Sequence, residues 1–82
     1  MQITSIKNRK TQREVCGQYL HKEVDLLKSK VEFGKPLVIY YETGSFFTHE
    51  DVVDCDQNDY VIKITTTNKV WRIERIWLNE TR

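Results

Sequence analysis

The sequence predicts an α+β fold, in which one N-terminal amphipathic helix packs on a strongly bent, five-stranded antiparallel sheet. Three observations support this prediction. Apolar residues first recur every three or four positions, and after Pro36 they recur every second position. Turn signals then return at intervals of roughly a dozen residues, as in a meander or small barrel. With 82 residues and 9.8 kDa, the chain has room for one domain.

The helix is predicted over residues 12–32. The segment Thr11-Gln12-Arg13-Glu14 fits a capping box, and Gly34 followed by Pro36 is a typical helix stop. The intervening apolar residues form one stripe at helical spacing: Cys16, Leu20, Val24, Leu27 and Val31. Such a helix would be about 30 Å long. Because a small sheet covers less than this length, we expect a homodimer or a larger homo-oligomer.

The strands are predicted from alternating apolar residues between turns. The expected turns are Thr43-Gly44-Ser45, Asp56-Gln57-Asn58-Asp59 and Thr67-Asn68-Lys69, and the last expected strand contains Ile76 and Leu78. Residues 1–10 are predicted to be a basic N-terminal arm or an edge strand, and residues 11–82 a single helix-plus-barrel domain. One helix followed by short, sharply bent strands is the element order of Sm-like small barrels.

Charge is unevenly distributed along a chain whose net charge is only +1. This small net charge excludes a DNA mimic and a strongly basic nucleic-acid binder. Residues 42–59 hold six acidic residues and no Lys or Arg, whereas residues 1–15 and 60–82 are basic. Two interpretations remain open: neighbouring strands neutralise each other, or two surfaces of opposite sign bind two partners.

The residues indicate no catalytic chemistry, so we expect no enzymatic activity, no cofactor and no metal. Asp54-x-Asp56-x-Asn58 matches the start of a calcium loop, but Asp59 and Thr65 stand where Gly and Glu are required. His21, His49, Cys16 and Cys55 have no metal-ligand spacing. No apolar run is long enough to span a membrane and no signal peptide is recognisable, so a cytoplasmic protein is expected.

A protein-binding face is the preferred interpretation of the acidic middle and the aromatic residues. Strand alternation predicts that Val52 points outward among carboxylates. The candidate protein-binding residues are Phe46, Glu50, Asp51, Val52, Asp54, Asp56 and Trp77. The alternative is binding of RNA or DNA by the basic residues Lys7, Arg9, Lys10 and Arg13. A third interpretation is that the aromatic residues predicted to point outward, Tyr40, Phe46 and Trp77, belong to the core.

Residues from about 20 to 79 resemble the YolD-like family, which is grouped with Sm-like folds. The matching segments are Leu37-Val38-Ile39-Tyr40-Tyr41-Glu42-Thr43-Gly44, Asp51-Val52-Val53-Asp54-Cys55-Asp56, Val61-Ile62-Lys63-Ile64 and Ile73-Glu74-Arg75-Ile76-Trp77. Glu50 or Asp51 stands where the family has Gly, and the family's N-terminal extension has no match, as in a diverged or truncated member.

The resemblance implies a non-enzymatic accessory or inhibitory factor of a bacterium, a phage or another mobile element. Its partner would be a larger host or phage protein, such as a DNA polymerase or a nuclease complex. The alternative that the fold resemblance implies is an Sm-like RNA- or DNA-binding protein.

Overall fold

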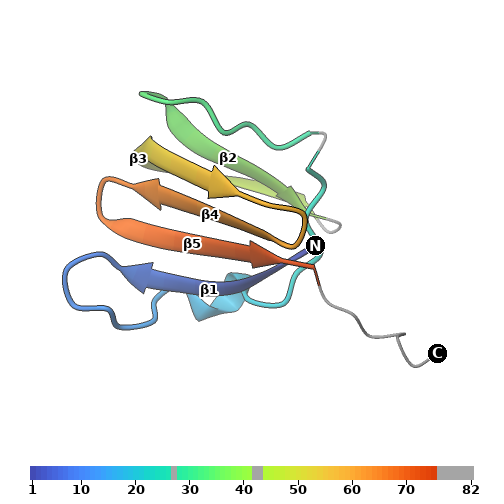
Figure 1. Ribbon diagram of the computed structural model, residues 1–82, viewed down its shortest axis with the longest axis horizontal. Coiled ribbons are helices and arrows are strands. Elements are labelled where there is room, and N and C mark those ends of the chain that lie inside the picture. The colour runs from blue at the N-terminus through green and yellow to red at the C-terminus, as the bar shows by residue number, and fades with distance from the viewer. Residues whose placement is uncertain (27, 42–43, 76–82) are drawn as a thin grey trace.

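The computed structural model describes residues 1–26, 28–41 and 44–75, and its main element is one five-stranded antiparallel sheet in the order β1-β5-β4-β3-β2 (Figure 1). The strands are β1 (Gln2–Asn8), β2 (Pro36–Tyr41), β3 (Gly44–Gln57), β4 (Val61–Thr66) and β5 (Lys69–Glu74). The predicted strand at Ile76 and Leu78 lies outside the described residues. No helix in the described part of the chain is long and apolar enough to cross a membrane.

The predicted N-terminal helix, and with it the α+β fold class, is wrong. Within residues 12–32 the described chain forms only one short 3-10 turn, η1 (Gly17–Tyr19). Gln12, Cys16 and His21 have φ angles of 64°, 55° and 67°, in the left-handed region. A right-handed helix cannot continue through a residue in that region. The expected self-association also rested on the small core of so short a chain, so the loss of the helix removes one of its two grounds, and self-association stays a prediction.

The segment between β1 and β2, residues 9–35, is an extended strap that joins the two edges of the sheet. Along β1, the amides of Val15 and His21 donate to the carbonyls of Ile6 and Ile3 at 2.8 and 2.7 Å. Along β2, the amide of Asp25 donates to Tyr40 at 2.7 Å. The strap thus runs beside β1, crosses one end of the sheet and reaches β2 (Figure 1). Its backbone groups are satisfied by neighbouring strands rather than by a helix.

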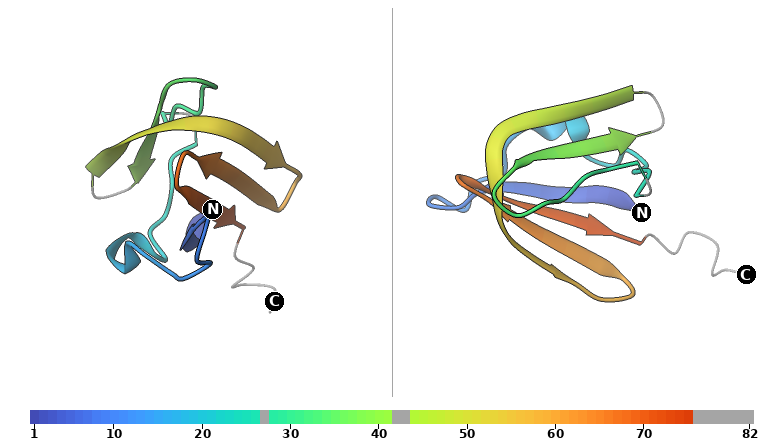
Figure 2. Two further views of the ribbon diagram at one scale, coloured as in Figure 1. Left: turned by 90° about the vertical axis from the view of Figure 1, so that its left-hand side faces the viewer. Right: turned by 90° about the horizontal axis from the view of Figure 1, so that it is seen from above.

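Strand β3 turns the sheet into a half-barrel because it bends in the middle. Its first half pairs with β2 and its second half pairs with β4, and Figure 2 shows the bend from above. A register shift between Val52 and Asp54 marks a β-bulge at this point. The bulge leaves Val52 1% exposed and Val53 51% exposed. The prediction that Val52 points outward is therefore wrong, because the extra residue reverses the alternation.

The core lies between the concave side of this sheet and the strap. Its largest fully buried side chains come from all five strands: Ile3, Ile6, Leu37, Ile39, Val52, Ile64, Thr66, Trp71 and Ile73. From the strap, Val24 is buried, and Cys16, Leu20 and Val31 pack against the core while partly exposed. Four residues of the apolar stripe therefore contact the core without forming a helix, and the fifth, Leu27, lies outside the described residues.

Candidate functional site

The predicted protein-binding residues do not form one face. Asp51, Asp54 and Asp56 are exposed on β3, whereas Val52 belongs to the core. Trp77 and the side chain of Phe46 lie outside the part of the structure that is described. Among the residues of this group whose side chains the structure describes, the three aspartates are exposed and can meet a partner.

Glu50, also predicted to bind a partner, instead anchors the turn between β4 and β5. Its Oε1 accepts hydrogen bonds from the Thr66 hydroxyl at 2.8 Å and the Asn68 amide at 2.9 Å, and its Oε2 pairs with Lys69 Nζ. The indole of Trp71 donates to Thr66 Oγ1 at 3.2 Å, which ties the network to the core. Burial by itself raises the pKa of Glu50, but the donors around it hold that pKa below the ordinary value.

The basic residues predicted to bind nucleic acid also differ in their surroundings: Arg9 bonds to a turn of the sheet, and the other three have exposed side chains. Arg9 Nη1 donates to the carbonyls of Thr66 and Thr67 at 3.4 and 3.1 Å, so this guanidinium anchors the same turn. Lys7, Lys10 and Arg13 have exposed side chains.

The described residues form a groove that sequence analysis did not foresee. Two adjoining cavities of about 850 and 560 Å³ share Leu26, Gln57 and Ile62, so they form one continuous depression, here called the seam groove. It lies where the strap faces β4 and the ends of β3 and β5. Its floor contains the otherwise buried side chains of Ile39, Ile62, Ile64 and Ile73.

Large apolar side chains border the seam groove. Leu26, Phe33 and Tyr60 line it with exposures of 44%, 67% and 54%. Among the described residues, only Tyr40 and Val53 are further large apolar side chains with comparable exposure. Three of these five therefore gather at one hollow, which is the arrangement typical of a binding surface.

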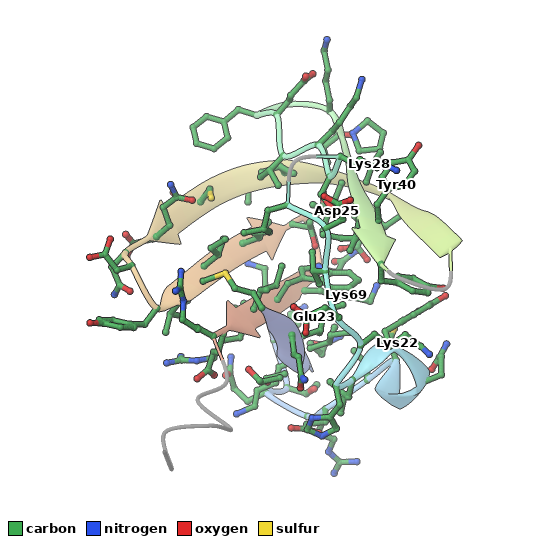
Figure 3. All side chains as sticks on the ribbon, turned by 90° about the vertical axis from the view of Figure 1, so that its right-hand side faces the viewer. Lys22, Glu23, Asp25, Lys28, Tyr40 and Lys69 are labelled. Atoms are coloured by element: carbon green, nitrogen blue, oxygen red, sulfur yellow. The ribbon has the colours of Figure 1, made fainter. Side chains whose placement is uncertain are left out.

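The charged residues of the groove are mainly at one end. Asp25, Asp59 and Arg75 line that end, together with Met1. Figure 3 shows Asp25 and Lys28 on the strap close to Tyr40 of β2, with Glu23 further along the strap. The N-terminal ammonium pairs with Glu23 at 2.7 Å. The opposite end is lined by apolar or uncharged residues alone.

The groove also contains one of the two free thiols. Cys55 is partly buried there, and burial, assisted by the charges of Asp54 and Asp56, raises the pKa of its thiol. A thiol with a raised pKa is mostly protonated at neutral pH and is a weak nucleophile. Within the described residues, no three His, Cys, Asp or Glu side chains are grouped to hold a metal ion.

The sequence signals for the groove were present but were assigned to other roles. Leu26 lies off the apolar stripe, and Phe33 comes immediately before Gly34, the predicted helix stop. Each is a large apolar residue without a place in the predicted helix face. Such misplaced apolar residues are the signal that could have indicated an exposed site.

No protein-family model, curated protein or solved structure matches this chain. The resemblance to the YolD-like family therefore stays a prediction.

Proposed function

We propose that this chain is a non-enzymatic protein-interaction module, which holds an apolar segment of a larger partner protein in the seam groove. The observation that carries the proposal is that three exposed large apolar side chains line the seam groove: Phe33 beside the isoleucine floor, Tyr60 at the charged end, and Leu26 in both parts. Large apolar and aromatic side chains beside a preformed hollow supply most of the binding energy at protein interfaces. A bound segment would cover all three.

The charges around the groove favour a partner segment that also carries Lys or Arg. Asp25 and Asp59 line one end of the groove, where Arg75 is the one cationic side chain among the lining residues. Complementary charge accelerates association and discriminates between partners. A basic surface of a nucleic-acid enzyme or a nuclease complex has this character. The partner class we propose is therefore a larger bacterial or phage protein of this kind, which the module regulates or inhibits.

The test uses peptides selected from a random library against the intact chain. The selected peptides are expected to combine large apolar residues with Lys or Arg. Replacing Phe33 and Tyr60 together by Ser should weaken their binding at least about tenfold, or 1.4 kcal/mol, in fluorescence anisotropy. Both residues are more than half exposed, so the variant should keep the melting temperature of the parent.

The matched control is Val53→Ser, because Val53 is 51% exposed and does not line the groove. This variant should bind the selected peptides like the parent. The proposal fails if the peptides bind the Phe33→Ser, Tyr60→Ser variant as tightly as the parent, or if Val53→Ser costs as much affinity.

A further inference from the structure

A second hollow lies on another part of the surface and has the opposite electrical character. It measures about 250 Å³ and is lined by Ser5, Lys7, Gln12, Lys63, Val70 and Arg72, here called the basic basin. Lys63 and Arg72 alternate with the buried Ile62, Ile64, Trp71 and Ile73, so the basin is on the convex side of the sheet. No carboxylate lines it, whereas three cations and two neutral polar side chains do.

The basin contains a cross-strand pair of like charge. Lys63 of β4 stands directly opposite Arg72 of β5. Like charges in this position repel each other. Arg72 is paired with Glu74, and Lys63 faces Asp56 of β3, but neither Lys63 nor Lys7 forms an ion pair within the part of the chain that the structure describes. An anion in the basin would relieve the repulsion between Lys63 and Arg72.

Arg72 is oriented for such an anion. Its Nε donates to Glu74 Oε2 at 2.8 Å, and Glu74 also accepts a 2.7 Å hydrogen bond from the Thr4 hydroxyl. One side of the guanidinium is thereby held while its side chain remains 50% exposed. A guanidinium fixed in this way presents its other N–H groups as a fork that matches phosphate oxygens.

The positive surface continues along β1 toward its end. Asn8, Arg9, Lys10, Thr67 and Asn68 line a neighbouring hollow of about 370 Å³, which has no acidic residue. The two hollows follow each other along β1, since Lys7 lines the basic basin and the next residue, Asn8, lines the second hollow. Lys63, Arg72, Lys7 and Lys10 therefore form a row rather than a single cluster, and a ligand with one phosphate would contact only part of it.

We infer that this row binds the phosphodiester backbone of single-stranded nucleic acid, with successive phosphates beside Lys63, Arg72, Lys7 and Lys10. Ser5 and Gln12 add neutral donors of the kind that contact phosphates. The exposed carboxylates of Asp54 and Asp56 on the neighbouring β3 would repel a second strand, which favours a narrow ligand. No aromatic residue lines either hollow, so binding is expected to be independent of base sequence.

The experiment measures binding of fluorescein-labelled oligothymidine by anisotropy over a series of KCl concentrations. The variant changes Lys7, Lys63 and Arg72 together to Gln. Affinity at low salt should fall at least tenfold. The slope of log K against log salt should become shallower by about 2, since each lost phosphate contact on a single strand removes about 0.7.

The matched control changes Lys28, Lys30 and Lys35 to Gln, since these exposed strap residues lie outside both hollows and give the same change of net charge. It should retain binding. Lys7→Gln alone should fold like the parent, because Lys7 is exposed. It should reduce the slope of log K against log salt by about 0.7. The inference is overturned if the parent chain does not bind the oligonucleotide, if both triple variants weaken equally, or if duplex DNA binds as tightly. Phe33→Ser with Tyr60→Ser should leave this binding unchanged, which separates the inference from the proposed function.

Discussion

Replacing Glu50 by Ala tests whether this residue stabilises the fold or serves as a binding residue. Its carboxylate accepts three hydrogen bonds, and the side chains of Glu50 and Lys69 are 15% and 25% exposed. A hydrogen bond to a charged group contributes about 1.5–3 kcal/mol when it is buried. Water can replace part of the loss at Lys69 and at the exposed Asn68 amide, so we expect a total cost of about 2–3 kcal/mol.

A loss of this size should be clear in thermal unfolding followed by circular dichroism. For a domain of this length, the melting temperature falls by about 4–8 °C per kcal/mol, so Glu50→Ala should melt at least about 8 °C below the parent. Asp51→Ala is the control, since Asp51 is the exposed neighbour and should change stability by less than about 0.5 kcal/mol. A melting temperature of Glu50→Ala within 2 °C of the parent would refute the reasoning.

Three further predictions concern the strap, the carboxylates and a thiol. His21→Gly should be more stable than His21→Ala by up to about 1 kcal/mol in urea unfolding, because φ is 67° there; the predicted helix requires the opposite order. The pKa values of Glu50 and Glu74 are held below 4.5, so their stabilisation is present above that pH and is lost as pH falls through the lower folded values. Glu50→Gln should flatten this acid loss in pH-dependent unfolding, and an unchanged pH profile would contradict the assignment. In a Cys16→Ser variant, iodoacetamide should alkylate Cys55 more slowly in the folded chain than in urea, and equal rates would show that Cys55 is not shielded.

The strands were predictable because their signals are local. Alternation in Leu37–Tyr41 and around Ile62 and Ile64, with turn residues at Asn58 and Asn68, places β2, β4 and their turns correctly. The sequence could not show that the helix prediction was wrong, because a spacing of three or four apolar residues also suits an extended strap that contacts the core at intervals. The left-handed backbone conformation of Gln12, Cys16 and His21 excludes the helix. Tertiary hydrogen bonds stabilise this conformation, and the residue types at these positions do not predict it.

The site was less accessible to sequence reasoning than the fold. Acidic character identified Asp51, Asp54 and Asp56 as exposed, but it could not separate them from Glu50, whose partners come from the β4–β5 turn. The bulge near Val53 exchanged inward and outward positions, and bulges depend on how two strands meet rather than on one strand's composition. The seam groove needs the strap and β4 together, so no single segment could reveal it.

The pairing of β1 with β5 affects how the protein folds while it is being synthesised. The hydrogen bond between Thr4 and Glu74 spans 70 residues of sequence, so β1 cannot complete its pairing until β5 has been synthesised. Contacts this distant along the chain slow folding, and an open strand edge can associate with other chains in the meantime. The strap can protect one edge of β1 early through bonds such as Val15 to Ile6. The other edge stays open until Lys69–Glu74 has been synthesised, so β1 is exposed to such association for as long as the residues between β1 and the end of β5 take to be made.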